Sequence, residues 1–554
     1  MALGKYIVGI DVGNFMTYVS VVRDGKVISI PTAAGKVGFP TCVVFDGEMC
    51  LVGEAAEEYA GKEPCIFNIK PLYTHATMVG SRELQLPVQK SYDVVFMKQK
   101  RGFKAQEIMA VILAQAKNDA ERFLGERIKG AVIAVPNYYH SEQRKAMMKA
   151  AFIANLPVER LISDTSGLML SKGLEFDGYH VVVDFGSTSF QLAVIVREAG
   201  VVRVLENASC EVGGQGLTEN IKDKVELTVK KKLGVDSAIT RADAAKLHKA
   251  CEKAKCELDT SAEALVEVSL FGVQVSHMIN REDYELICQY KLLEIFRLCS
   301  KAVDHPHHGT YNGIIIAGQS AKSFKFLEAM KTIFPGALIA AESFSVAHGA
   351  AKLYAEGPSR LMEIPHVNFY AKSSINNAMP IIFKGASLPT SNPKCFTVPY
   401  PSNSFTISFT SESLLLDSFK VNNHIAYNMK LNFILEVDIN GIFNVTYYAQ
   451  SHLVLHHLLP ATPNTFELIE VSSKGLTIAQ TSLPSSLTSF KQTVQKLRSL
   501  IKESQQAGND RPELILLYIS CLNWLDSSAQ RPDTTIQPLL AKLDRIDWWL
   551  KQRF

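Results

Sequence analysis

The sequence predicts a large α/β domain followed by a small β domain and a helical tail, on the basis of three observations. Apolar strands alternate with amphipathic helices up to about residue 357. From about residue 367 to 470, clusters of Pro, Asn, Ser and Gly separate short strands, and long helical patterns are absent. From about residue 484, apolar residues return to helical spacing. A chain of 554 residues is also too long for one hydrophobic core, so we expect two to four domains.

The first region alternates strands and helices. Apolar residues at helical spacing over 105–124 predict an amphipathic helix. Ser141 can serve as the N-cap of another helix, with Glu142 in its first turn, where a negative charge suits the helix dipole. Strands are expected at residues 6–10, 19–22, 130–135, 180–184, 191–196 and 313–317.

The character of the sequence changes after Gly357. A short connector that includes Pro365 comes first. Alternating apolar and polar residues over 405–409 and 431–437 then suit a half-buried sheet. In the tail, Gly508 and Pro532 separate three helical segments. These changes predict four regions, at residues 1–357, 358–366, 367–470 and 484–554.

Composition excludes several classes of protein. The formal net charge of +3 is close to neutral for this length, which argues against a general nucleic-acid or anionic-membrane surface. We find no secretory signal at the N-terminus and no apolar stretch long enough to span a bilayer. The ten cysteines form no C-x-x-C pair, and Cys251 and Cys256 suit reduced core thiols better than a bridge or a metal site. A cytoplasmic location is the simplest expectation.

Two Asp-x-Gly turns carry the chemistry of the first region. Asp11 and Gly13 follow one apolar strand, and Asp184 and Gly186 follow another. The glycines let backbone N–H groups approach a phosphate, and each aspartate can hold a hydrated magnesium ion. A P-loop would instead need G-x-x-x-x-G-K-[ST] leading into a helix. The paired turns therefore predict a duplicated phosphate cradle.

Further segments resemble those of one chaperone family, and they follow the family's order along nearly the whole chain. They resemble its opening strand and turn, a V-P-A-Y-F segment, an adenosine helix, an adenosine loop, a D-x-N-G-I strand and part of a helical lid. The segments are residues 8–56, 132–144, 251–258, 314–320, 437–445 and 523–526. On these motifs the chain is identified as a divergent member of the seventy-kilodalton heat-shock chaperone family.

The resemblance implies a duplicated actin-like ATPase domain over 1–357, a β-sandwich peptide-binding domain over 367–470 and a short helical lid over 484–554. It implies an ATP- or ADP-binding chaperone that uses magnesium and holds unfolded or nascent polypeptides. It also implies roles for individual residues. Lys70, Asp164, Asp184 and Asp11 would serve hydrolysis, with Asp11 and Asp184 holding magnesium through water. The nucleotide would be held by Gly13, Asn14, Gly186, Gly213, Gly214, Glu252, Lys255, Gly318, Ser320 and Lys322.

Several positions depart from the family pattern where ATP is split. Asn14 and Phe15 stand where the family has two threonines, and residues 187–189 read Ser-Thr-Ser in place of G-G-T. Gln191 replaces an aspartate, and a glutamine can neither accept a proton nor ligate magnesium as an anion. Lys322 replaces an arginine that stacks on the base, and lysine stacks less well. We therefore expect nucleotide binding with slow or absent hydrolysis.

Signalling between the domains is a separate question. Pro136 and Arg144 match positions that take part in it within the family, but each also suits a purely local role. The connector reads Leu-Met-Glu-Ile-Pro over 361–365 and lacks the family's apolar run followed by Asp.

Two histidine clusters lack the partners of a zinc site, and we interpret them as surface or core residues. They are His305, His307 and His308, and His452, His456 and His457.

Three other functions stay open. Gln191 and the triplet at 441–443 resemble the hundred-and-ten-kilodalton branch of the family, which would make the chain a nucleotide exchange factor for an ordinary family member. A ribosome-associated, non-hydrolysing chaperone is another candidate. A sugar-kinase-like enzyme on the same duplicated fold is a third, against which the β region and the tail argue. An ordinary family chaperone and a J-domain co-chaperone are the expected protein partners.

Overall fold

The structure describes most of the first 449 residues and one later hairpin. The predicted tail at 484–554 and both histidine clusters lie outside the described residues. The computed structural model describes residues 4–46, 49–59, 65–70, 73–75, 87–96, 99–172, 177–234, 238–270, 272–303, 311–334, 338–340, 342–373, 378–398, 402–411, 414–425, 429–449, 465–472 and 475–482.

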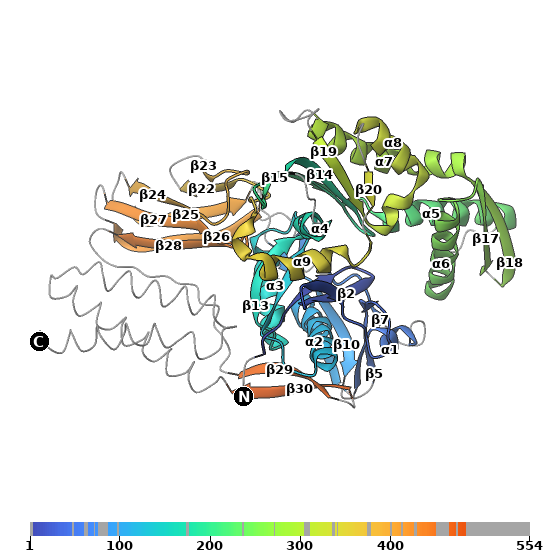
Figure 1. Cartoon of the computed structure of the whole chain (residues 1–554), viewed down its shortest axis with the longest axis horizontal. Coiled ribbons are helices and arrows are strands. Elements are labelled where there is room, and N and C mark those ends of the chain that lie inside the picture. Colours follow the sequence, from blue (N-terminus) through green and yellow to red (C-terminus); the bar gives the residue numbers. More distant parts are fainter. Residues whose placement is uncertain are drawn as a thin grey trace, which may run out of the picture.

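The first lobe of the large domain (Figure 1) is built on a mixed six-stranded sheet. The central strand is β1 (Ile7–Val12), all of whose residues are buried, as expected for a strand covered on both faces. It runs parallel to β12 and antiparallel to β2. The sheet order is β13 (Val158–Ser163), β12 (Gly130–Val135), β1, β2 (Met16–Arg23) and β3 (Lys26–Ser29), with β4 (Phe39–Pro40) paired to β2.

The second lobe repeats this arrangement. Its central strand β14 (Gly178–Phe185) is parallel to one neighbour, β19, and antiparallel to the other, β15, as β1 is to β12 and β2. The repeated order shows the duplication that the paired Asp-x-Gly turns predicted. The sheet order is β20 (Leu338–Ala340), β19 (Tyr311–Ala317), β14, β15 (Phe190–Glu198), β16 (Val201–Cys210) and β21 (Leu361–Met362).

Helices and small sheets cover the two lobes. Among the described residues, no helix is both long and apolar enough to cross a membrane. The helices are α1 (Glu54–Glu57), α2 (Ala105–Leu124), α3 (Ser141–Ile153), α4 (Asp164–Lys172), α5 (Gly214–Leu233), α6 (Arg241–Glu257), α7 (Arg281–Val303), α8 (Phe324–Ile333), α9 (Ser345–Glu356), η1 (Gln319–Lys322) and η2 (Pro358–Arg360). The small sheets contain β5 (Val43–Asp46), β6 (Met49–Val52), β7 (Cys65–Ile66), β8 (Tyr73–His75), β9 (Pro87–Gln89), β10 (Ser91–Phe96), β11 (Gln99–Lys104), β17 (Glu263–Leu270) and β18 (Val273–Asn280).

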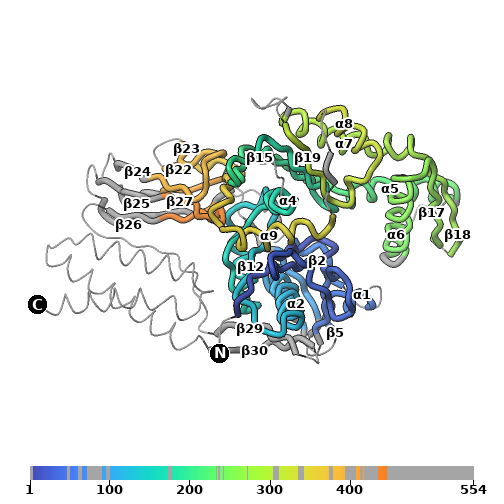
Figure 2. Tube along the Cα trace, in the orientation of Figure 1, coloured from blue at the N-terminus to red at the C-terminus, as the bar shows by residue number. Residues whose placement is uncertain are grey.

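Helices α4 and α9 join the two lobes at their common base. Helix α9 comes from the second half of the domain but packs on β1, β2 and β12 of the first sheet, and Figure 2 shows it between the lobes. The two helices approach so closely that a Cβ on Gly349 would lie 1.7 Å from the carbonyl oxygen of Gly167. A Cβ on Gly9 would likewise meet the backbone of α9 at 2.2 Å. Glycine is therefore required at this junction, where backbone packs on backbone.

The predicted elements of the large domain are confirmed with one correction. The strand at 130–135 and the helix at 105–124 have the predicted bounds. The helix expected to be capped by Ser141 is capped instead by His140, whose ring accepts the backbone N–H of Gln143. Ser141 is the first helical residue, and its hydroxyl accepts the backbone N–H of Phe443 at 2.9 Å. The Ser141 hydroxyl therefore binds a residue 302 positions later in the chain instead of capping its own helix.

Two antiparallel sheets follow the large domain. Strands from both contribute to one apolar cluster, in which Phe369 stacks on Phe443 with ring centroids 5.0 Å apart. The predicted strands at 405–409 and 431–437 fall inside β25 (Ser402–Ser411) and β27 (Met429–Val437). The β-sandwich and its peptide groove stay predictions. The sheets are β23 (Met379–Ile382), β22 (Phe369–Ser373), β25 (Ser402–Ser411) and β26 (Leu414–Ile425), and β24 (Thr390–Val398), β27 (Met429–Val437) and β28 (Phe443–Ala449); β29 (Thr465–Ser472) pairs with β30 (Gly475–Ser482).

The turn between β27 and β28 rests against the first lobe. The motif at 437–445 forms this turn, and the Asp438 carboxylate accepts the backbone N–H groups of Asn440 and Ile442 at 2.9 Å each. Arg144 donates to the carbonyl of Asn440 at 3.0 Å, and the Asn440 side chain accepts the N–H of Leu161 at 2.9 Å. Arg144 is itself buried. The β region is therefore held on the large domain by specific hydrogen bonds.

The connector is also held in place. Its strand β21 extends the second sheet by pairing with β16. Glu363 is buried, and one of its carboxylate oxygens accepts the N–H of Ser163 at 2.8 Å and the hydroxyls of Ser163 and Ser166 at 2.6 and 2.8 Å. Arg160 donates to the carbonyls of Pro358 and Leu361. The family's aspartate is absent here, but a buried carboxylate still fixes the connector.

We predict that Glu363→Ala releases the connector. The substitution leaves three donors without their acceptor, which costs about 1–3 kcal/mol for each buried group. Hydrogen–deuterium exchange of residues 361–363 should then become at least tenfold faster. Glu356→Ala is the matched control, because Glu356 lies on the surface and pairs only with Arg360 in the described part of the chain, at 3.5 Å. Unchanged exchange in the Glu363 variant would contradict this role.

Candidate functional site

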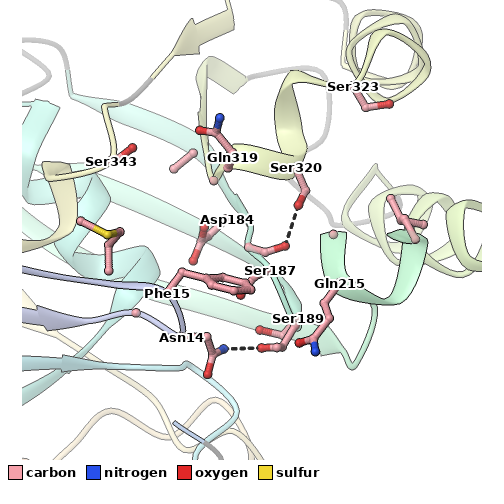
Figure 3. A pocket seen from close by; sticks show the side chains of 18 of the residues that line it. Asn14, Phe15, Asp184, Ser187, Ser189, Gln215, Gln319, Ser320, Ser323 and Ser343 are labelled. Atoms are coloured by element: carbon pink, nitrogen blue, oxygen red, sulfur yellow. Dashed lines mark hydrogen bonds between the residues drawn. The ribbon is translucent and has the colours of Figure 1, made fainter. Parts of the chain in front are cut away.

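A cavity of about 540 Å³ opens between the two lobes (Figure 3). Both Asp-x-Gly turns line it, and so does the predicted adenosine segment of α6 and η1. Gly213 and Lys322 are not among its lining residues: Gly213 is the N-cap of α5, and Lys322 ends η1. The predicted site residues that do line the cavity are Asp11, Gly13, Asn14, Lys70, Asp164, Asp184, Gly186, Gly214, Glu252, Lys255, Gly318 and Ser320.

Three carboxylates surround one ammonium group at the base of the cavity. The Lys70 Nζ lies 3.0 Å from Asp164 Oδ2 and 4.0 Å from Asp11 Oδ1. The Gln191 Nε2 donates to Asp164 Oδ2 at 3.0 Å and to Asp184 Oδ2 at 3.2 Å. Lys70, Asp11 and Asp164 are buried. The sequence-predicted catalytic residues are therefore brought together, and Gln191 connects two of them.

The strand register explains how these side chains meet. Asp11 and Asp184 occupy corresponding places near the ends of the central strands β1 and β14. Gln191 stands directly opposite Asp184 in the β14–β15 pair, so their side chains share one face of the sheet. Gln191 Oε1 accepts the N–H of Asn137 at 2.6 Å, which fixes the orientation of the amide. The amide NH₂ therefore points at the carboxylates.

The crowding of negative charge changes the acid–base properties of the cluster. Burial raises the pKa of Asp11 to about 7, opposed by the ammonium of Lys70 and reinforced by the neighbouring carboxylates. Burial and the Asp164 carboxylate raise the pKa of Asp184 to about 7 as well. Burial alone would lower the pKa of Lys70, but Asp164 and Asp11 together hold it above its ordinary value. Without a further cation, the site carries protons near neutral pH.

The two glycine turns have the same backbone geometry. The N–H of Gly13 donates to the carbonyl of Met16 at 2.9 Å, and the N–H of Gly186 donates to that of Ser189 at 3.0 Å. The second turn is tied to the start of α5 through Gly214 N–H to Gly186 carbonyl, at 3.1 Å. The N-terminus of a long helix therefore adjoins the turns, which favours a bound anion.

Side chains cross the space between the turns. The Asn14 amide donates to the Thr188 hydroxyl, which links residues from the two lobes. The Phe15 side chain is 54% exposed, and Figure 3 shows its ring inside the cavity near Asp184 and Ser187. Asn14, Phe15, Gln191 and residues 187–189, which depart from the family pattern, thus line the cavity near Asp184, whereas Lys322 does not line it.

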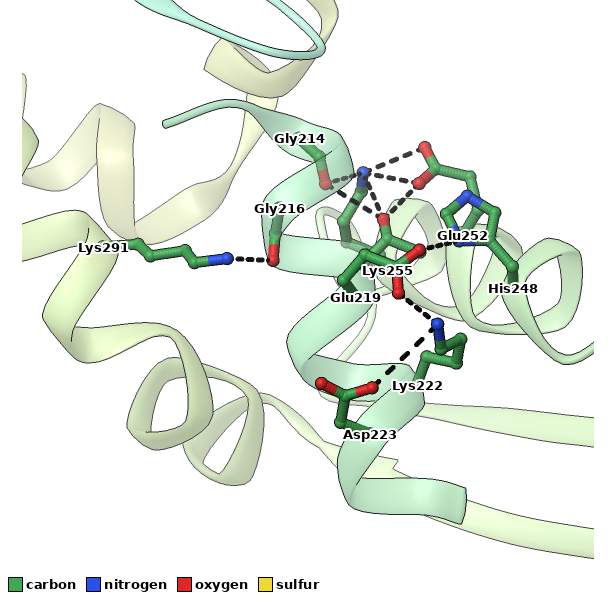
Figure 4. Close-up of polar contacts among 10 residues, drawn as sticks. Gly214, Gly216, Glu219, Lys222, Asp223, His248, Glu252, Lys255 and Lys291 are labelled. Carbon is green, nitrogen blue, oxygen red and sulfur yellow. Dashed lines mark hydrogen bonds and ion pairs between the residues drawn. The ribbon is translucent and has the colours of Figure 1, made fainter. Parts of the chain in front are cut away.

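The other end of the cavity presents an ion pair between the buried Lys255 and the partly exposed Glu252 (Figure 4). The Lys255 Nζ lies 2.7 Å from Glu252 Oε2 and donates to the carbonyl of Gly214 at 3.0 Å. The Lys255 ammonium and the Thr218 hydroxyl hold the pKa of Glu252 below its ordinary value, against the opposing effect of burial. Ser320 donates to the carbonyl of Gly186 at 2.9 Å, which joins the predicted adenosine loop to the phosphate turn.

The sequence did not indicate several residues that the structure adds to the site. Tyr139 donates its hydroxyl to the carbonyl of Lys70, and Thr218 contacts both Glu252 and Lys255. Cys256 was interpreted as a core thiol, but it is exposed and lines the cavity. Burial raises the pKa of Asp259, another lining residue, to about 6. Only the four-residue spacing of Glu252 and Cys256 on one helix could have placed Cys256 in the site.

The donor set fits magnesium held through water. In the described part of the chain, no three His, Cys, Asp or Glu side chains gather closely enough to hold a metal ion directly. The Asp11 and Asp184 carboxyls nevertheless retain protons near pH 7, and Asp164 Oδ1 is buried without a hydrogen-bond partner among the described residues. A hydrated cation would satisfy these oxygens and displace the protons.

Comparison with known proteins identifies the family. The Hsp70 protein family model matches residues 7–333, more than half of the chain, so the chain belongs to the Hsp70 family. The chain is similar to heat shock 70 kDa protein BIP3 of Oryza sativa (29% identity over 357 residues, 60% of this chain and 53% of the relative). It is similar to chaperone protein DnaK of Nitrosopumilus maritimus (33% over 277 residues, 48% and 41%) and to a heat shock 70 kDa protein of Trichophyton rubrum (24% over 500 residues, 79% and 74%). The chain spans about half the length of the first two, and the modest identities fit a divergent member.

We predict that the cluster makes the folded state less stable as pH rises. The folded-state pKa values of Asp11 and Asp184 lie above the unfolded values near 4, so folding binds protons between about pH 4 and 7. The free energy of unfolding, measured in urea, should fall by about 2 kcal/mol or more between pH 5 and pH 7.5 and then level off. Asp184→Asn should reduce this fall, whereas the exposed Asp223→Asn should not. Equal slopes in all three proteins would contradict the raised pKa values.

Proposed function

We propose that this chain is an ATP- and ADP-binding chaperone that binds unfolded polypeptide and hydrolyses ATP slowly or not at all. The observation that carries the proposal is the single cavity with a carboxylate–ammonium cluster at one end and the Glu252–Lys255 pair at the other. Members of the Hsp70 family generally bind nucleotide with magnesium and act on unfolded polypeptides. The predicted nucleotide-contacting residues other than Gly213 and Lys322 line this cavity.

The two ends of the cavity suit the two ends of a nucleotide. The glycine turns and the start of α5 supply N–H groups for phosphate oxygens, while Glu252 can accept hydrogen bonds from ribose hydroxyls. Asp11 and Asp184 would hold magnesium through water, and the ion would supply charge neutralisation to the phosphates. Lys70, fixed by Asp164, would place its ammonium beside the terminal phosphate. These roles come from the resemblance to the family, and the position of each residue at the cavity supports them.

Slow hydrolysis follows from how the cluster is arranged. Phosphoryl transfer depends on groups that position a water molecule and neutralise developing charge. The amide of Gln191 donates to Asp164 and Asp184, so it occupies carboxylate lone pairs instead of adding a negative charge or a base. The Asn14–Thr188 hydrogen bond lies across the space between the two turns. A terminal phosphate would have to break that bond to enter.

A nucleotide exchange factor is the second candidate. The buried Glu363 and the Arg144–Asn440 contact hold the connector and the β region on the large domain, which suits a protein that acts through one fixed arrangement. Accelerated release of labelled ADP from a hydrolysing Hsp70 would favour this role. Binding to unfolded peptide without such release would favour the chaperone. No contact in the described residues favours the ribosome-associated or sugar-kinase alternatives.

We predict that Glu252→Ala weakens nucleotide binding. The carboxylate lines the cavity and is held by Lys255, so its removal should raise the dissociation constant of ADP, measured by calorimetry, about tenfold. Lys253→Ala is the matched control on the same helix, because the Lys253 side chain is 77% exposed. Comparable affinity in both variants would place the nucleotide elsewhere.

We further predict that hydrolysis is limited by the residues between the turns. Gln191→Asp combined with Asn14→Thr restores a carboxylate and opens the Asn14–Thr188 bridge, so the single-turnover rate of ATP hydrolysis should rise about tenfold or more. Adding Lys70→Ala to this variant should abolish the gain, because the ammonium that neutralises phosphate charge is lost. A wild-type rate that already equals that of an ordinary Hsp70 would overturn the proposal of slow hydrolysis.

A further inference from the structure

Helix α7 presents large apolar side chains to solvent. Leu286, Tyr290 and Leu293 are 63%, 79% and 48% exposed. They are spaced by four and three residues, so they form one stripe along the helix. An aromatic side chain this exposed, between two exposed leucines, is typical of a surface that contacts another molecule. The opposite face of the helix is already buried in the second lobe through Tyr284, Cys288, Leu292, Ile295, Cys299 and Ala302.

Charged residues extend the stripe at both ends. Glu282 lies one turn before Leu286, and Arg297 and Lys301 lie one and two turns after Leu293; all three charged side chains are exposed. No ion pair joins any of the three to another residue in the described part of the chain. The six positions follow one another at intervals of four, four, three, four and four residues. These intervals read the same from either end of the helix. The spacing is therefore palindromic about a point between Tyr290 and Leu293.

The charges along the stripe are opposite at its two ends. A second copy of α7, laid antiparallel across the first, would bring the acidic end of each helix to the basic end of the other. A parallel copy would instead bring like charges together, which is destabilising. The antiparallel arrangement has twofold symmetry, the commonest symmetry of soluble homodimers. It pairs Glu282 with Lys301, Leu286 with the aliphatic part of Arg297, and Tyr290 with Leu293 of the second copy.

We propose that this stripe on α7 is a binding surface for a second copy of the chain. The inner face of α7 packs on α5, α8, β15, β16 and β18, so the outer face is presented by a rigid support (Figure 1). Two crossed helices bury less than the roughly 1,600 Å² of a standard interface, so the dimer is weak and reversible. The proposal is independent of the proposed nucleotide function, because no residue of the stripe lines the cavity.

The first test measures the association of the full-length chain by sedimentation equilibrium over a wide range of concentration. The wild type should form a dimer, and Leu286→Ser combined with Tyr290→Ser should lower its association constant at least tenfold. Leu227→Ser is the matched control, because Leu227 is 51% exposed on α5 and outside the stripe. A wild type that stays monomeric at every concentration would overturn the proposal. The proposal would fail equally if this monomer bound a different protein through the stripe.

Charge reversal tests the antiparallel register. Glu282→Lys and Lys301→Glu should each lower the association constant about tenfold, because each places like charges together at two symmetric contacts. The double variant should associate within about threefold of the wild type, because both pairs are again of opposite charge. Circular dichroism would confirm that each variant is folded. The stripe does not pair with itself if the single reversals leave the association constant unchanged. The same conclusion follows if the double variant does not recover the association constant of the wild type.

Discussion

Two buried carboxylates, a third that is partly buried and one buried ammonium group impose the main constraint on this molecule. Burial and the neighbouring carboxylates raise the pKa of Asp11 and of Asp184 to about 7, although the ammonium of Lys70 opposes this rise. Such a cluster is costly unless something positive completes it. The cleft between the lobes gives access to a magnesium–nucleotide complex that would do so. The same cluster joins residues from both lobes, and its charge balance is therefore coupled to how the lobes sit on each other.

Gln191 changes what this cluster can do. Its amide donates to two acids at once, which lowers the need for a cation without supplying a base. The Asn14–Thr188 bond adds a second link between the turns. Both contacts join groups that phosphoryl transfer would have to move, and both therefore support the proposed slow or absent hydrolysis.

Specific hydrogen bonds also hold the connector and the β27–β28 turn on the large domain. The connector contributes a strand to the second sheet. The Glu363 carboxylate, which is buried, accepts hydrogen bonds from three protein groups where water would otherwise donate. In the β27–β28 turn, the Asn440 carbonyl accepts from Arg144 and the Asn440 side chain accepts from the N–H of Leu161, so the contact depends on both the backbone and the side chain of this residue. Among the described helices, only α7 exposes a stripe of several large apolar side chains. The opposite charges at the two ends of this stripe suit an antiparallel second copy.

Local patterns in the sequence predicted the main secondary-structure elements and both Asp-x-Gly motifs. The helix at 105–124, the strand at 130–135 and both Asp-x-Gly turns follow from local periodicity and turn chemistry, which act over a few residues. The place of Lys70 and Asp164 beside the two aspartates was expected only from the resemblance to the family's segments. Tertiary structure alone decided that Gln191 bridges two acids, that Ser141 accepts from Phe443 instead of capping its helix, and that Cys256 lines the cavity. These outcomes depend on distances between residues that are far apart in the chain, and no local pattern encodes such distances.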